Sequence, residues 1–209
     1  MKLKSIMKPM APTVEAGSYL AVCVGVVFIG EQYIPPFGDK KGRYENRLMF
    51  VWDIPSELDE NGTPKQLSKA INATSSAKGN LMVILSGWNS RTYTKEELAD
   101  TEVNDQLGKP CMLSVGVNEN GYVNVTAVSA IPKGIPAPVS NTPFIKFDVN
   151  EWSDEGFAAL PEWVQNRIKE STEYQKLHVP TDPVDVDTSG GQQAGAADSG
   201  QAQKEENPI

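Results

Sequence analysis

The chain has 209 residues, 39% of them hydrophobic, and a formal net charge of -8. This length accommodates one domain of ordinary size with appendages. Its longest apolar run, residues 19–29, is much shorter than the roughly 18–20 residues of a membrane-spanning helix, so we expect no membrane segment. Residues 1–12 are lysine-rich and broken by proline, and we expect no export signal there.

The acidic residues are concentrated at the C-terminal end of the chain. Residues 1–148 hold 15 basic and 15 acidic residues, whereas residues 180–209 hold six acids and one lysine. The first 148 residues are therefore neutral as a whole. A neutral domain can still carry a local basic groove that binds nucleic acid.

The predicted elements follow in chain order. Alternating apolar residues from Gly17 to Ile34 indicate a long curved strand, in which Gly25 and Gly30 permit bends. A hairpin loop over residues 35–43 leads to a returning strand that Pro55 ends. Residues 65–73 are ambiguous. Beyond them we expect short helices over Asn80–Leu85 and Thr94–Asp100, a hairpin of Cys111–Val117 with Tyr122–Ala130 turning at Asn120-Gly121, and one helix over Phe157–Leu177.

These elements predict a mainly β protein. We expect an OB-like Greek-key barrel with short helices in residues 1–148, with a sandwich as the alternative. Residues 149–179 form a C-terminal helical segment that packs on the barrel. Residues 180–209, rich in Gly, Gln, Ala, Ser and Asp, form a disordered acidic tail because they bury too little apolar surface to offset chain entropy.

The residues needed for most catalytic chemistry are missing from the sequence. His178 is the only histidine, and Cys23 and Cys111 are the only cysteines, both within strand patterns typical of buried, reduced thiols. No phosphate-binding or dinucleotide-binding glycine motif occurs. We therefore expect no enzyme, no cofactor and no metal site. A carboxylate-dependent nuclease is the remaining enzymatic alternative, although its candidate acids fall mostly in a turn: Asp53, Glu57, Asp59 and Glu60.

Basic and aromatic residues alternate in two segments, a composition typical of proteins that hold phosphates while stacking bases of a single strand. The alternative for the first segment is a solvated hairpin whose lysines resist edge pairing. Trp88, beside the second segment, is expected in the core rather than at a ligand. The predicted DNA-binding residues are Tyr33, Lys40, Lys41, Arg43, Tyr44, Arg47, Trp52, Arg91 and Tyr93, with Phe37 and Lys95 nearby and Lys69, Lys109, Tyr122 and Lys133 as weaker candidates.

A β domain followed by a Gly/Gln-rich linker and an acidic, then apolar, chain end resembles bacterial single-stranded DNA-binding proteins. In that family the barrel binds single strands, and the tail end recruits replication, recombination and repair proteins. The resemblance implies that Glu205 and Glu206 contact basic residues of a partner, that Pro208 bends the peptide and that Ile209 anchors it. Lys204 and Asn207 depart from the family pattern.

Residues 17–177 are also similar to phage-encoded early-region proteins regarded as single-stranded DNA-binding. The motifs that carry this similarity are Leu107-Gly108-Lys109-Pro110-Cys111, Val128-Ser129-Ala130-Ile131-Pro132-Lys133-Gly134 and Leu160-Pro161-Glu162-Trp163. The resemblance implies a single-stranded DNA-binding protein with little sequence preference, acting in phage replication or recombination in the bacterial cytoplasm. The alternative is a protein-interaction or phage assembly module that does not bind DNA. The sequence leaves homo-oligomer formation open.

Overall fold

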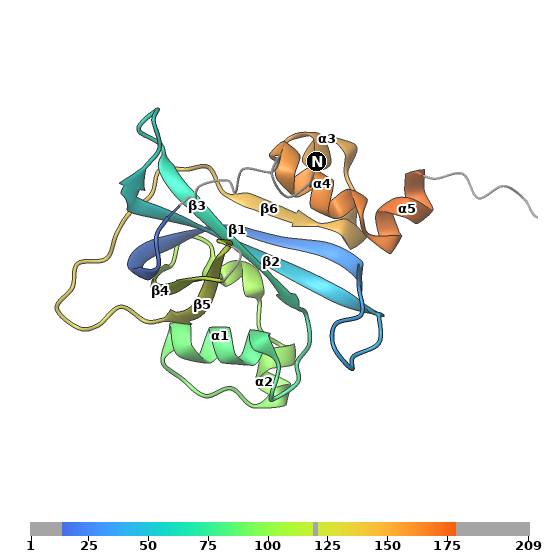
Figure 1. Cartoon of the computed structure of the whole chain (residues 1–209), viewed down its shortest axis with the longest axis horizontal. Helices are drawn as coiled ribbons and strands as arrows, with labels where there is room; N and C mark the ends of the chain where they lie inside the picture. Colours follow the sequence, from blue (N-terminus) through green and yellow to red (C-terminus); the bar gives the residue numbers. More distant parts are fainter. Residues whose placement is uncertain (1–13, 119–120, 179–209) are drawn as a thin grey trace, which may run out of the picture.

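The computed structural model of the chain describes residues 14–118 and 121–178. Its centre is a six-stranded sheet in which five strands run antiparallel in the order β3-β2-β1-β4-β5, while β6 joins β1 in parallel. Helices lie on two sides of this sheet (Figure 1). The strands are β1 (Gly17–Ile34), β2 (Arg43–Leu58), β3 (Pro64–Asn72), β4 (Pro110–Val117), β5 (Val123–Ser129) and β6 (Ile145–Asp148).

The long strand β1 organises the sheet, as its apolar alternation predicts. It pairs with β2 from Val22 to Ile34, and its opposite edge pairs first with β4 and then with β6. The register shifts just before Gly25 and just before Gly30, so the predicted bends are confirmed. Gly30 has a φ of +79°, a conformation that glycine adopts without steric cost.

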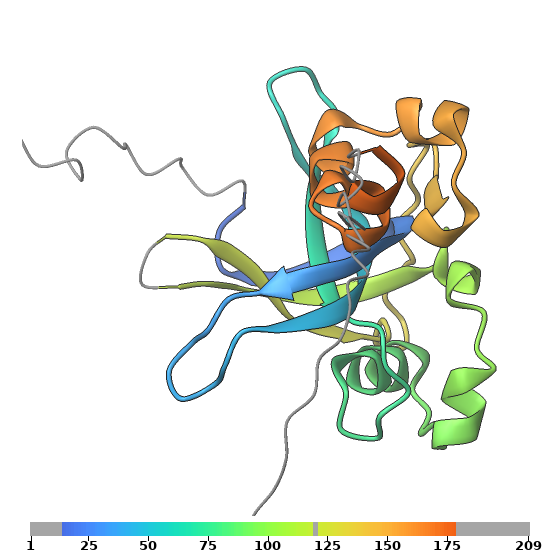
Figure 2. The ribbon, with the colours of Figure 1, turned by 90° about the vertical axis from the view of Figure 1, so that its right-hand side faces the viewer.

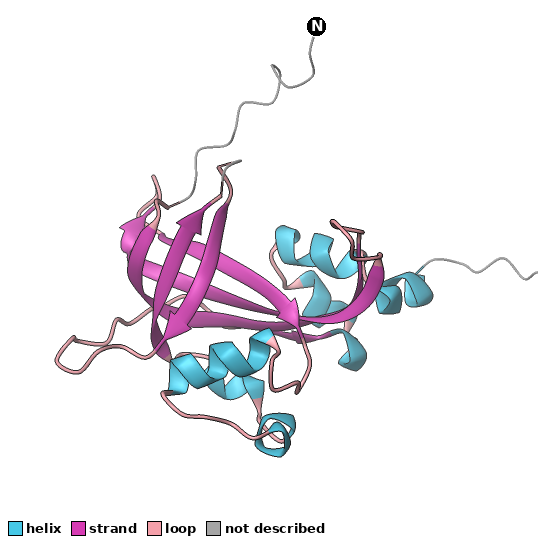
Figure 3. Ribbon diagram, turned by 60° about the horizontal axis from the view of Figure 1, so that its bottom comes forward, coloured by secondary structure: helices cyan, strands magenta, loops and turns pink. Residues whose placement is uncertain are grey.

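Two hydrophobic cores form on opposite faces of β1 and β2, because successive side chains of a strand point in opposite directions. On one face, Phe50 and Trp52 pack with the helices α1 (Asn80–Asn89) and α2 (Lys95–Ala99) and the 3₁₀ helix η2 (Val103–Gln106). On the other face, Ile29 and Met49 pack beneath the C-terminal helices. Figure 3 shows these two groups of helices separated by the sheet.

The C-terminal segment forms three short helices rather than the single helix predicted over residues 157–177. They are α3 (Asp154–Ala158), α4 (Glu162–Lys169) and α5 (Thr172–His178), preceded by the 3₁₀ helix η3 (Val149–Glu151). Pro161 lies at the N-cap of α4, and the buried Ser171 accepts a hydrogen bond from the Tyr174 amide at the start of α5. Val164 and Ile168 lie on one face of α4 and face the sheet, as the helical spacing predicts. Pro161 and Ser171 divide the segment into separate helices.

Two strands were not predicted: the ambiguous residues 65–73 correspond to strand β3, and β6 had no counterpart in the sequence analysis. Other predicted elements are confirmed in type and corrected in extent. Pro55 does not end β2, which continues to Leu58. Pro55 has no partner in either ladder, because pairing with β1 ends at Asp53 and the register with β3 is irregular between Ile54 and Leu58. The Thr94–Glu97 capping box and the β4–β5 hairpin, with Gly121 at a φ of +81°, are confirmed.

The buried carboxylate of Asp53 holds the irregular segment 131–144 against β2. It accepts hydrogen bonds from Gln66 Nε2 at 2.9 Å and from the hydroxyls of Ser140 and Thr142. Because Asp53 is 0% exposed, its carboxylate oxygens depend on these donors for hydrogen bonds. It ties β2 to β3 and to the segment that leads into β6.

Replacing Asp53 with Ala is expected to lower the free energy of unfolding by about 3 kcal/mol, because three donors lose their buried acceptor. Urea denaturation measures this loss. Asp59→Ala is the matched control, since Asp59 also accepts hydrogen bonds but lies in the exposed β2–β3 turn, and we expect a much smaller loss of stability. Equal losses in the two variants would contradict the anchoring role.

Candidate nucleic-acid interface

The free end of the β1–β2 ribbon exposes three aromatic rings. Tyr33 and Tyr44 are cross-strand partners whose ring centroids lie 5.3 Å apart, and they are 54% and 59% exposed. Phe37 in the connecting loop is 86% exposed. These are large apolar surfaces facing solvent at the end of a ribbon rather than in a core.

Several local features constrain the backbone of this ribbon end. Phe37 and Lys40 exchange two backbone hydrogen bonds of 3.1 Å and close the tip of the loop. Pro35 and Pro36 restrict the backbone before the tip. Gly42 leaves room for the Tyr33 ring, because a Cβ at this position would overlap the Tyr33 hydroxyl. The rings are thus presented on a constrained hairpin.

Two arginines of β2 share one carboxylate. Arg43 Nε donates to Glu45 Oε1 at 2.7 Å, Arg47 Nη1 donates to Glu45 Oε2 at 2.8 Å, and Arg47 Nη2 donates to the Ala70 carbonyl at 2.7 Å. Burial would raise the pKa of the Glu45 carboxyl, but the hydrogen bonds and charges of Arg43 and Arg47 outweigh it and hold that pKa below its ordinary value. Sequence reasoning missed Glu45, although its position between two arginines at i-2 and i+2 was a visible signal.

The predicted ligand contacts of this segment divide between the two faces of the ribbon. Arg43, Glu45 and Arg47 alternate with Tyr44, so the charged side chains and the tyrosine pair point to opposite sides. Lys40 and Lys41 are exposed at the tip beside Phe37. We call the side chains of this ribbon end the hairpin surface: Tyr33, Phe37, Lys40, Lys41, Arg43, Tyr44 and Arg47.

A lysine links the two edge strands of the sheet, β3 and β5. Lys69 in β3 donates from Nζ to the Val125 carbonyl of β5 and, at 3.3 Å, to Asn124 Oδ1. Burial, and secondarily the positive charge of Arg47, lower the pKa of the Lys69 ammonium. Beside Asn124, Tyr122 is 70% exposed in the β4–β5 hairpin.

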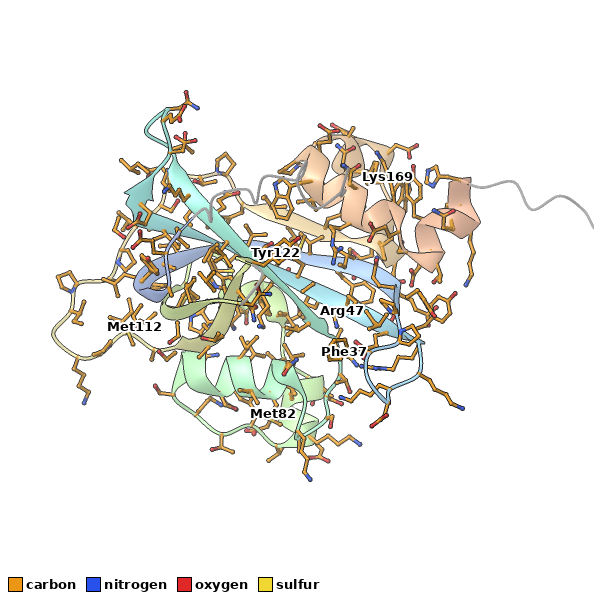
Figure 4. The ribbon with its side chains drawn as sticks, viewed as in Figure 1. Phe37, Arg47, Met82, Met112, Tyr122 and Lys169 are labelled. Carbon is orange, nitrogen blue, oxygen red and sulfur yellow. The ribbon has the colours of Figure 1, made fainter. Side chains whose placement is uncertain are left out.

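The two hairpins lie on the same side of the molecule. Figure 2 shows the β1–β2 and β4–β5 hairpins projecting in one direction, away from α2. In the projection of Figure 4, Arg47 is drawn between Tyr122 and Phe37. Lys69 and Arg47 lie on opposite faces of the sheet, because Lys69 pairs with the inward-facing Phe50 while Arg47 has the parity of Met49 on the other face.

The second predicted cluster lies elsewhere, after α1. Arg91 stacks over the Tyr93 ring at 4.1 Å and pairs with Glu97 at 3.0 Å, while the Tyr93 hydroxyl accepts a hydrogen bond from Asn89. Trp88 is buried, as predicted, and donates to the Pro110 carbonyl. The structure does not bring this cluster to the hairpin surface.

The structure corrects one predicted DNA-binding residue, Trp52. It is 0% exposed and packs between Phe50 and Trp88, with ring centroids 5.6 and 6.0 Å away. Every second residue of β2, at positions 48, 50, 52 and 54, points into the core beneath α1, and Trp52 is one of them. A base has no access to this ring, so Trp52 is a core residue.

The described residues also form a groove with a volume of about 730 Å³ between α2 and η2 on one side and β6, η3 and α3 on the other. Its floor consists of apolar side chains of β1 and β2. Its charged lining residues are Glu102, Lys146, Asp148 and Glu151. Three acids against one lysine disfavour phosphates, so this groove is a poorer nucleic-acid site than the hairpin surface.

Comparison of the chain with protein families, with curated proteins and with solved structures finds no match. No helix within residues 14–118 and 121–178 is long and apolar enough to cross a membrane. In the same residues, no group of three or more His, Cys, Asp or Glu side chains is arranged to hold a metal ion. The predicted partner-binding residues Glu205, Glu206, Pro208 and Ile209 lie outside the described part of the chain.

Proposed function

We propose that this protein binds single-stranded DNA through the hairpin surface, with little sequence preference. The observation that carries the proposal is the exposure of Tyr33, Phe37 and Tyr44 on a constrained hairpin that also holds Lys40 and Lys41. Every base has a face that stacks on an aromatic ring, and lysines attract phosphates of any sequence. Such a surface recognises the chemistry of a single strand rather than its base order.

The order and pairing of the strands support an OB-like barrel as the finer description of the fold. Strand β1 pairs with both β2 and β4, helix α1 lies between β3 and β4 in the chain, and Lys69 bridges β3 to β5 where the barrel would close. OB folds bind oligonucleotides with the face of strands 2 and 3 and with the loops between strands 1 and 2 and between strands 4 and 5. Here those two loops carry Phe37 and Tyr122.

The biological setting we propose is phage DNA replication or recombination in the bacterial cytoplasm. The barrel would cover and protect single strands, and the tail with Glu205, Glu206, Pro208 and Ile209 would recruit partner proteins. This part of the proposal is supported by the sequence resemblances alone.

A protein-interaction or assembly module is the second candidate. The segment 131–144 favours it, since Val139 is 80% exposed and Ile135 is 44% exposed in a proline-rich stretch that the buried Asp53 holds in place. Such a module would not bind DNA, and it would still bind its partner protein after deletion of residues 180–209.

Fluorescence anisotropy with labelled poly-dT tests the proposed function. We expect binding to poly-dT that exceeds binding to duplex DNA of equal length at low salt, and that weakens as salt rises because phosphate contacts release counterions. Equal affinity for duplex and single strand, or no binding at low salt, would overturn the proposal. Degradation of the strand on addition of magnesium would instead indicate the nuclease alternative.

A further inference from the structure

The Arg43–Glu45–Arg47 cluster suggests how affinity at the hairpin surface is set. The Glu45 side chain is 9% exposed and lies between the two arginines of the same strand face, bonded to both. One carboxylate therefore engages Nε and Nη2 of Arg43 and Nη1 of Arg47. Within the described residues, no ion pair joins Lys40 or Lys41 to a carboxylate.

Carboxylates and phosphates compete for the same N–H groups of arginine, because both present two oxygens that match the guanidinium fork. We propose that Glu45 is a built-in competitor for DNA phosphates, which occupies both arginines in the free protein and lowers the affinity of the hairpin surface. This inference rests on the proposed function. It adds a specific residue that weakens binding rather than one that provides it.

The two arginines differ in how readily they can exchange Glu45 for a phosphate. The Arg43 side chain is 49% exposed, and its only hydrogen-bonding partner within the described residues is Glu45. Arg47 is 21% exposed and is also held by the Ala70 carbonyl of β3. Arg43 is thus the residue that leaves Glu45 for a phosphate, while Arg47 keeps Glu45 in place.

The variant Glu45→Gln tests this role, because glutamine keeps the shape of the side chain and removes its charge. We expect the affinity for poly-dT to rise about 3- to 10-fold and the slope of log affinity against log salt to steepen by about 1, as one more phosphate contact forms. Glu45→Asp is the second variant. Its shorter side chain cannot span both arginines, and a smaller gain is expected.

Glu97→Gln is the matched control. It also removes one negative charge from an arginine–glutamate pair, with Arg91, but on the far side of the molecule from the hairpin surface. Both variants carry the same net charge, so a long-range effect of charge would appear equally in both. We expect the affinity of Glu97→Gln to stay within about twofold of the parent protein.

The outcomes separate the inference from the function on which it rests. If the parent protein shows no preference for single strands, the proposed function fails, and Glu45 loses its role with it. If the parent protein binds poly-dT but Glu45→Gln and Glu45→Asp bind no more tightly than Glu97→Gln, the competitor role is overturned and single-strand binding stands. Tighter binding by Glu45→Gln, with the steeper salt slope and an unchanged Glu97→Gln, supports the inference.

Discussion

Replacing Tyr33, Phe37 and Tyr44 together with Ala should reduce the affinity for poly-dT by at least about 100-fold. Each ring that stacks a base contributes roughly 1–3 kcal/mol, and three rings are lost. The salt slope should change little, because the lysines and arginines proposed to contact phosphates remain. Anisotropy titrations at several salt concentrations measure both quantities.

Trp163→Ala is the control for this prediction. Trp163 is also an exposed aromatic residue, at 39%, but it lies on α4, outside the hairpin surface. Its replacement should leave poly-dT affinity unchanged. If the triple variant retains full affinity while its circular dichroism is unaltered, bases do not stack on this hairpin and the binding surface lies elsewhere.

Replacing Trp52 with Ala should lower the free energy of unfolding by about 3–5 kcal/mol, since the ring is fully buried among aromatic neighbours and its loss leaves a cavity. This is a large part of the roughly 5–15 kcal/mol that stabilises a typical domain. Urea or thermal unfolding measures the loss. A reduction in DNA binding by this variant would then reflect unfolding.

Trp52→Phe separates the core role from a ligand role. The Trp52 Nε1 group is buried and has no hydrogen-bond partner within the described residues, so phenylalanine removes an unsatisfied donor along with part of the ring. We expect a smaller loss of stability than for Trp52→Ala and no change in poly-dT affinity. Weakened DNA binding by a stably folded Trp52→Phe protein would contradict the assignment of Trp52 to the core.

The sequence predicts the strands of this protein better than their partners. Period-two alternation marks β1, and an Asn-Gly turn marks the β4–β5 hairpin, because both signals depend on neighbouring residues. Strand β6 has only four residues and pairs with β1 across more than one hundred positions. No local sequence pattern predicts this pairing between β1 and β6. The division of the C-terminal helix at Pro161, in contrast, follows from a local signal, because proline is disfavoured inside a helix and here precedes α4.

The candidate site was predicted in part. Tyr33, Phe37, Lys40, Lys41 and Tyr44 lie together at one exposed ribbon end, as the interleaved sequence suggests. Trp52 shares the same strand but belongs to the core, because exposure ends where α1 covers the inner face. Arg91 and Tyr93 form a separate contact with Glu97 and Asn89.

Composition and local pattern by themselves determined a β-rich domain, the hairpins that frame it and the concentration of acids toward the chain end. These properties depend on residue type and short spacing, which the sequence states directly. Tertiary structure alone decided which aromatic rings are exposed, that Glu45 occupies two arginines, and that the two hairpins project together. Those facts depend on the burial of one strand face and on contacts between distant segments, which arise only when the sheet and its two helical layers assemble.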